Sequence, residues 1–348
     1  MSDNNEKDLW VGVIGAGHAG RKHLMAIHDH PQTRVVGLAV ARPSRQRAAA
    51  LRAEFGAEFV TEDYRGLLAR DDVEIICISS PNRFHAQQSI DSLAAGKHVL
   101  CEKPMVTSIE DALRVVAASQ AARTSFLVGQ ICRFSPIFLA IKQLYDDGDL
   151  GQAFFAEADY IKQSLHVHKR WWLDPREPHF IVFNGGVHPL DLLRWVVGEV
   201  EEVQAYSNDV AVPEATFDDC VIATLRFTNG CVGKLLVAYG ARMPYELNLS
   251  IYGTRGTVRN DRLFLDRGQE CNSRGDRPVA PTHLPIPIVP EHPHFRQEWD
   301  DLVAAIEAGR ATRVDAADGA RTVALCAAVG QALDSGQPAR VAQDFCYY

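Results

Sequence analysis

The chain has 348 residues, of which 47% are hydrophobic and 23% charged, and its formal net charge is −8. A chain of this length exceeds one ordinary hydrophobic core, so we expect a globular protein of two domains. The acidic balance argues against nucleic acid as a partner, and the apolar runs fall far short of the roughly 20 residues of a membrane-spanning helix, so no membrane partner is expected.

The first part of the chain alternates short apolar runs with helical segments, which is typical of a parallel sheet with crossover helices. Strands are expected at residues 9–14, 34–40, 73–79, 98–101 and 125–128. Helices are expected near residues 18–30, 44–55, 84–95 and 107–122. This pattern predicts a parallel α/β domain over residues 1–130.

After Gly129 the pattern changes to long alternating runs, which continue to about residue 270. The Asn229-Gly230 pair between two such runs indicates a β-hairpin. A helix is expected near 188–197, and two closing helices near 293–308 and 316–335. The pattern over residues 131–348 therefore predicts an α+β domain with a large, mostly antiparallel sheet. The closing helices at 293–335 could also pack on the first domain.

Eight cysteines are scattered along the chain without a CxxC pair or a regular spacing. We interpret them as buried free thiols and expect no zinc site. The polar start MSDNNEKD lacks the basic and apolar regions of a signal peptide, which predicts a cytoplasmic protein.

The first chemical motif is GAGHAG, which directly follows the strand at 9–14 and opens a helix. Glycines are needed there because the chain turns sharply, approaches a pyrophosphate and packs a helix on the strand. The unpaired N–H groups of the helix N-terminus then face the phosphates. We therefore predict a dinucleotide site that includes Gly15, Gly17, His18, Ala19 and Gly20. The alternative is a merely tight turn.

The second strand is not followed by the acidic residue that usually holds the ribose 2′-hydroxyl of NAD. Instead Arg42, Ser44 and Arg45 stand at that place, and two guanidinium groups with a hydroxyl suit a phosphate dianion. The pattern favours NADP as cofactor. The alternative is that Pro43 opens a helix whose arginines are solvated, which leaves NAD usable.

Two polar clusters follow apolar strands at the edge where ligands of open α/β sheets bind. In SSPNRFH we assign Ser80, Pro81, Asn82 and His85 to the cofactor, although an Asn after a proline also forms turns. In KHVLCEKPM, Glu102 and Lys103 end the strand, and we assign both to the cofactor site as well. A partly desolvated lysine beside a cationic nicotinamide releases its proton readily, which suits proton transfer. The alternative is a capping salt bridge between Glu102 and a neighbouring residue, which leaves Lys103 on the rim.

Three segments, GAGHAGRKHL, SSPNRFHAQQSIDSLAAGKHVLCEKPM and GGVHPLDLLRWVVGE, closely resemble the Gfo/Idh/MocA family of NAD(P)-dependent oxidoreductases. The resemblance runs through nearly the whole chain. It implies a Rossmann-like, doubly wound N-terminal domain, and a C-terminal α+β domain whose open sheet carries the substrate and commonly the oligomer interface. It also implies that Lys103 lies beside the substrate hydroxyl and that His188 is its acid–base partner.

The chain departs from the family at Asn184, where relatives often have Asp four residues before the histidine. On a helix Asn184 and His188 share one face, and Asn184 then orients substrate without taking a proton. Alternatively the helix begins only just before Pro189, with Asn184 near the N-cap and two glycines giving room for substrate. Asp191 supports the helix dipole or bonds the histidine.

These residues predict reversible oxidation of a secondary alcohol of a sugar, inositol or sugar derivative by hydride transfer to nicotinamide C4. Trp171, Trp172, His166 and Asp191 are candidate substrate contacts, although the tryptophans also suit domain packing. The pair His166 and His168 lacks a third ligand, so no metal is proposed. Two alternatives are an NAD-dependent lyase or glycosidase without net redox change, and a non-catalytic regulator. A homodimer or homotetramer through the C-terminal sheet is expected.

Overall fold

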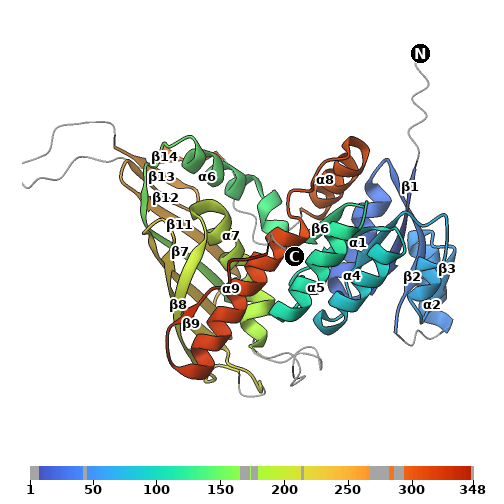
Figure 1. Ribbon diagram of the computed structural model, residues 1–348, viewed down its shortest axis with the longest axis horizontal. Helices are drawn as coiled ribbons and strands as arrows, with labels where there is room; N and C mark the ends of the chain where they lie inside the picture. Colours follow the sequence, from blue (N-terminus) through green and yellow to red (C-terminus); the bar gives the residue numbers. More distant parts are fainter. Residues whose placement is uncertain are drawn as a thin grey trace, which may run out of the picture. The chain divides into compact units, whose positions relative to one another are not determined.

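The structure is a computed structural model that describes residues 8–41, 45–164, 173, 179–212, 215–266, 282–285 and 294–345 (Figure 1). Contacts divide the chain into two compact units. The first unit comprises residues 1–131, 293–323 and 344–348, and the second comprises residues 132–292 and 324–343. The chain therefore leaves the first unit at residue 132, returns to it at residue 293, enters the second unit again at residue 324 and ends in the first.

The first unit contains a six-stranded sheet in the order β3-β2-β1-β4-β5-β6 with all neighbours parallel. Its strands are β1 (Leu9–Ile14), β2 (Thr33–Ala39), β3 (Phe59–Thr61), β4 (Ile75–Ile78), β5 (His98–Glu102) and β6 (Phe126–Gly129). Every residue of β4 is buried, as expected for a strand covered on both faces. The strand order reverses between β1 and β4, and open α/β sheets bind ligands at such a switch point.

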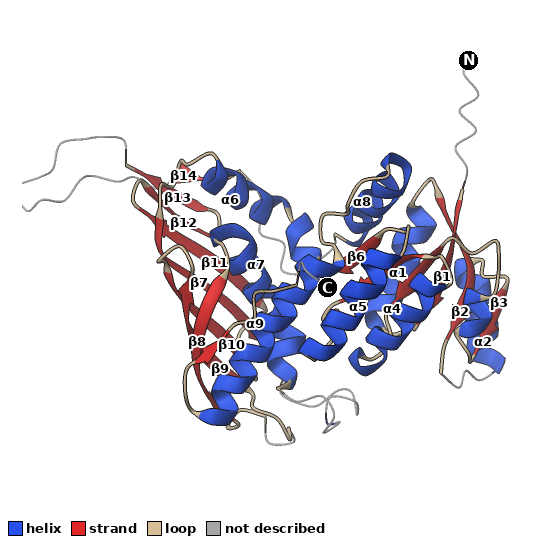
Figure 2. Cartoon of the chain, viewed as in Figure 1, coloured by secondary structure: helices blue, strands red, loops and turns tan. Residues whose placement is uncertain are grey.

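Helices cover this sheet in two sets, in which α1 packs against α8 and α4 packs against α5 (Figure 2). The helices are α1 (His18–Asp29), α2 (Arg45–Phe55), α3 (Arg65–Leu68), α4 (His85–Ala94), α5 (Ile109–Ala121) and α8 (Phe295–Ala308), with a 3₁₀ turn η1 (Asn82–Phe84) before α4. Ser108 caps α5 by accepting a hydrogen bond from the N–H of Asp111. The doubly wound fold expected from the sequence is confirmed.

The second unit contains a nine-stranded sheet in the order β14-β13-β12-β11-β7-β10-β9-β8-β15 over the described residues. The strands are β7 (Ala153–Lys162), β8 (Val200–Asn208), β9 (Cys220–Phe227), β10 (Val232–Tyr239), β11 (Glu246–Gly253), β12 (Gly256–Arg259), β13 (Arg262–Leu265), β14 (Thr282–His283) and β15 (Ala339–Arg340). Strands β7 and β10 are parallel, and the other pairs described are antiparallel. The expected mostly antiparallel sheet is confirmed.

One face of this sheet is buried and the other is open, because buried and exposed residues alternate along β9. Helix α7 (Val187–Val197) packs on β7 and β11. The remaining elements are α6 (Pro136–Asp146), α9 (Ala316–Ser335), a 3₁₀ turn η2 (Ile131–Phe134) and a π-helical turn η4 (Val182–Gly186). The boundary between the units runs within α9.

The sequence pattern missed β3, α3 and α6, and also the two-residue strands β14 and β15. Strand β3 has three residues and α3 has four, which is too short to show a period. Helix α6 has a proline in its first turn, which is a helix-start signal. It was missed because this part of the chain was interpreted as leading into alternating strands. Within the described part of the chain, no helix combines the length and hydropathy needed to cross a membrane.

Candidate functional site

The glycine turn after β1 is built by close backbone contacts. Gly15 has a φ of +96°, and a Cβ there would lie 2.6 Å from the carbonyl oxygen of Ser79. A Cβ on Gly20 would lie 2.1 Å from the carbonyl oxygen of Gly15. Both positions therefore require glycine for the turn itself and for packing α1 on the sheet.

Gly17 differs from these two glycines, because a Cβ there would meet nothing within 4 Å. Gly17 is the N-cap of α1 and has no side chain that could cap the helix, and the first turn of α1 has no acidic residue. The first N–H groups and the positive end of the helix dipole therefore receive no bond from the residue at the N-cap. This open space at a helix N-terminus fits a cofactor diphosphate. Ala19 is half-buried and His18 is exposed beside it.

The residues expected to choose between NADP and NAD lie largely outside the described part of the chain. Arg42 and Ser44 are not described, and Arg45 begins α2 with a side chain that is not described. The preference for NADP stays a prediction from the sequence.

The loop after β4 carries the next group of predicted residues. Asn82 begins η1 and is buried, and the Ser80 hydroxyl donates to Oε1 of Gln88 at 2.7 Å. His85 is the first residue of α4, and its ring lies between the carbonyl oxygens of Ser80 and Pro104. His85 was expected to contact the cofactor. Its ring is only 1% exposed and bonded within the protein, so it holds loops together instead.

Glu102 at the end of β5 is held by two hydrogen bonds. Its Oε1 accepts from Nε2 of His23 at 3.0 Å, and its Oε2 accepts from the backbone N–H of Lys103 at 3.0 Å. The indole N–H of Trp299 donates to Nδ1 of His23 at 3.3 Å, which places the His23 proton on Nε2. Burial raises the pKa of Glu102, but the His23 hydrogen bond and the Lys103 charge outweigh burial and lower it. Lys103 is half-buried, and the Lys103–Pro104 peptide bond is cis.

Glu298 on α8 lies near this cluster with both carboxyl oxygens buried and without a hydrogen-bond partner in the described part of the chain. Burial and the Glu102 charge raise its pKa well above the ordinary value. The surroundings therefore favour the protonated form of Glu298 and the charged form of Glu102. Sequence reasoning missed His23, Trp299 and Glu298, because no local pattern links α1, β5 and α8.

The second unit positions His188 in the first turn of α7, where it is 4% exposed. Its Nδ1 lies 3.4 Å from Sγ of Cys132. The ring of Tyr160 stacks on the imidazole, with the centroids 6.0 Å apart and an interplanar angle of 14°. These contacts fix the plane of the imidazole from two sides.

Asn184 lies in the π-helical turn η4, which continues directly into α7. The α-helical part begins at Val187, just before Pro189, but helical backbone precedes it, so the expectation that Asn184 lies near the N-cap is wrong. Oδ1 of Asn184 accepts a hydrogen bond from the Tyr239 hydroxyl at 2.7 Å. A Cβ on Gly185 would lie 2.8 Å from the Tyr160 ring. The glycine allows close packing on the sheet and does not leave room for substrate.

Asp191 is fully buried and forms an ion pair with Arg133. Its oxygens accept hydrogen bonds from Nε and Nη2 of Arg133 at 2.7 and 2.6 Å. The expectation that Asp191 contacts substrate or mainly supports the helix dipole is corrected, because its carboxylate ties α7 to η2. Such a bidentate buried pair fixes the helix that carries His188.

The other predicted substrate contacts, Trp171, Trp172 and His166, lie outside the described residues. Among the residues that the structure does describe, no group of three or more His, Cys, Asp or Glu side chains is arranged to hold a metal ion. None of the described cysteines is in a disulfide bond, and all of them except the half-buried Cys220 are buried.

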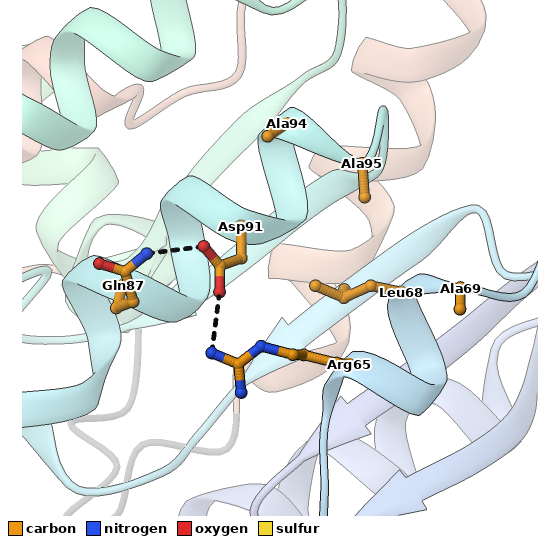
Figure 3. Close-up of a pocket in the computed structure, with 7 residues that line it drawn as sticks. All are labelled: Arg65, Leu68, Ala69, Gln87, Asp91, Ala94 and Ala95. Atoms are coloured by element: carbon orange, nitrogen blue, oxygen red, sulfur yellow. Dashed lines mark hydrogen bonds and ion pairs between the residues drawn. The ribbon is translucent and has the colours of Figure 1, made fainter.

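An open hollow of about 480 Å³ lies on the first unit between α3 and α4 (Figure 3). Figure 3 shows Asp91 bonded to Gln87 and paired with Arg65, beside aliphatic side chains. None of the predicted site residues lines this hollow. Its one carboxylate, Asp91, is bonded to Gln87 and paired with Arg65, so the glycine turn and the Glu102–Lys103 turn remain the candidate site of this unit.

Two family models match the chain. The model described as "Oxidoreductase family, NAD-binding Rossmann fold" matches residues 9–130, and the model described as "GFO/IDH/MocA C-terminal domain" matches residues 138–259. The chain is 30% identical to inositol 2-dehydrogenase of Rubrobacter xylanophilus, covering 98% of this chain and 95% of that protein. It is 24% identical to levoglucosan dehydrogenase of Pseudarthrobacter phenanthrenivorans, covering 97% and 95%.

The fold matches a solved structure of levoglucosan dehydrogenase in complex with NADH. The TM-score is 0.86 at 23% identity, and the match covers 97% of this chain and 100% of that chain. This likeness establishes the fold. With the two family models and the full-length relative, it shows that the chain belongs to the Gfo/Idh/MocA family of oxidoreductases, whose first domain is an NAD-binding Rossmann fold.

Proposed function

We propose that this oxidoreductase is a nicotinamide-dependent dehydrogenase that oxidises a secondary alcohol of a sugar, an inositol or a sugar derivative. The observation that carries the proposal is the open space beside Gly17 at the N-terminus of α1. The full-length relatives reported above are named as dehydrogenases of inositol and levoglucosan, which fits a nicotinamide cofactor at this place. We further propose that residues 1–130 bind the cofactor, and that residues 131–348 bind the substrate.

A bound nicotinamide cofactor supplies the hydride acceptor. The backbone of Gly15, Gly17 and the first turn of α1 holds its diphosphate. In our proposal Lys103 and His188 move the proton of the substrate hydroxyl, because an imidazole exchanges protons near neutral pH and a cationic nicotinamide ring favours the neutral form of a neighbouring lysine. Asn184 orients the substrate by hydrogen bonding and takes no proton.

The experiment that tests this function screens a panel of polyols, free sugars and glycosides with NAD and with NADP. We expect absorbance of the reduced nicotinamide to rise with at least one polyol or sugar. Product formation without any absorbance change and without added cofactor would contradict net dehydrogenation, and would instead support a lyase or glycosidase with transient oxidation. A panel without turnover of any kind would favour a non-catalytic cofactor-binding protein.

We propose NADP as the preferred cofactor, on the basis of Arg42, Ser44 and Arg45 and the missing acidic residue in this region. Replacing Arg42 by Ala should raise the Michaelis constant for NADP roughly tenfold, because a charge-assisted bond to the 2′-phosphate contributes about 1.5 kcal/mol. The Michaelis constant for NAD should change less than twofold. An unchanged ratio of the two constants would contradict the assignment.

We also propose that the open face of the nine-stranded sheet is an interface with a second copy of the chain. Register places Tyr206, Ile222 and Leu236 in one apolar row across β8, β9 and β10. Tyr206 is 70% exposed and Ile222 is 43% exposed. Apolar rows of this kind are typical of surfaces that associate.

Light scattering after gel filtration should therefore find a dimer or tetramer, and Ile222→Asp should shift the mass toward the monomer. The matched control is Met25→Asp, which places the same charge on α1 of the first unit, where the methionine is 53% exposed. It should leave the mass unchanged. A monomeric parent protein would refute the interface.

A further inference from the structure

His85 makes an unusual pair of hydrogen bonds. Its Nδ1 lies 2.9 Å from the carbonyl oxygen of Pro104, and its Nε2 lies 2.8 Å from the carbonyl oxygen of Ser80. A carbonyl oxygen only accepts hydrogen bonds, so each ring nitrogen needs a proton to satisfy this geometry. A neutral imidazole carries one such proton. The ring therefore satisfies both contacts only as an imidazolium.

The two carbonyl groups belong to different loops at the carboxyl edge of the parallel sheet. Ser80 follows β4, and Pro104 follows β5, where Lys103 precedes it. On its other side Lys103 donates its backbone N–H to Oε2 of Glu102. Two hydrogen bonds thus hold the main chain around Lys103. The Glu102 carboxylate binds the N–H of Lys103, and the His85 ring binds the carbonyl oxygen of Pro104.

We propose that His85 is a positioning residue that, as a buried imidazolium, joins the loops after β4 and β5 and fixes the backbone from which Lys103 acts. The proposal rests on the proposed function for the role of Lys103. The charge state and the joining of the loops rest on the geometry alone.

The electrostatics of the ring agree with this geometry. Burial lowers the pKa of His85, but the Cys101 side chain and the two carbonyl groups outweigh burial and raise it from 6.5 to about 9. The Cys101 thiol on β5 is a titratable group facing the ring, and the first turn of α4 contributes no acidic residue. Because folding raises the pKa of His85, protonation of the ring stabilises the folded state. This stabilisation is fully present below pH 6.5 and is lost as the pH rises through about 9.

The first test observes the ring directly. Nitrogen NMR of the ¹⁵N-histidine-labelled protein, with His85→Gln to assign the signal, should show both ring nitrogens protonated at pH 7.5. The imidazolium signature should disappear in a titration centred near pH 9. A neutral tautomer at pH 7.5 would overturn the proposal, whether or not the protein turns over any substrate. If His85→Gln folds poorly, His85→Asn assigns the signal instead.

The second test separates positioning from simple support of the fold. Between pH 6 and pH 10 the unfolding equilibrium constant of the parent should rise about a hundredfold more than that of His85→Gln. At pH 7.5 the variant should lose roughly fivefold to tenfold in kcat, with its cofactor dissociation constant within twofold of the parent. His28→Gln on the exposed face of α1 is the control, and should change neither quantity. Parallel pH curves for parent and His85→Gln would overturn the proposal, as would an unchanged kcat in an active enzyme.

Discussion

Replacing Lys103 by Met should lower kcat by a factor of about 10² to 10⁴, because the substitution removes an ammonium that exchanges the substrate proton and keeps a side chain of similar length. The dissociation constant of the cofactor should stay within about twofold, since the backbone of the glycine turn holds the diphosphate. Steady-state kinetics with the best substrate of the panel and fluorescence titration of the reduced cofactor measure the two quantities.

The control for Lys103→Met is Lys142→Met, which removes the same charge from α6, where Lys142 pairs with Asp146 on the surface. It should change kcat less than twofold. If Lys103→Met retained full turnover, the assignment of Lys103 to proton transfer would be wrong. If its only effect were on binding to another protein, the chain would act as a regulator instead.

The parallel half of the fold could be predicted because its signals are local. Apolar runs of strand length, glycines at fixed spacing and polar residues after strands give strand positions, the turn at Gly15 and the Glu102–Lys103 turn without any knowledge of contacts. Each of these patterns is set by residues only a few positions apart. The structure placed them where the periodicity predicted.

The support of the candidate site could not be predicted, because it depends on contacts between distant segments. His23 and Trp299 meet although they are 276 residues apart, and Asp191 meets Arg133 across 58 residues. The π-helical turn at Asn184 was equally hidden, since the same residues read as an ordinary helix start before Pro189. Sequence patterns show which side chains are polar, but not which of them will be buried together.

The buried pair Glu102 and Glu298 illustrates what this limit conceals. From sequence, Glu298 is one of several acidic residues on an amphipathic helix. In the folded protein it is 0% exposed, and burial with the Glu102 charge favours its protonated form. The pair therefore favours its negative charge on Glu102, next to Lys103. The charge next to Lys103 therefore depends on Glu298, which lies on a helix that begins at residue 295.

His188→Asn should lower kcat/KM by a factor of about 10² to 10⁴, because an amide keeps a polar group in place but cannot accept the hydroxyl proton. The decline of kcat/KM toward acid pH, where the imidazole is protonated, should disappear in the variant. The control is His179→Asn in the same unit, which removes an imidazole that pairs with Asp334 and should change kcat/KM less than twofold. Thermal unfolding of both variants checks that the stacking partner Tyr160 and helix α7 stay in place. A His188→Asn enzyme that keeps both its kcat/KM and its acid decline would show that another group takes the proton.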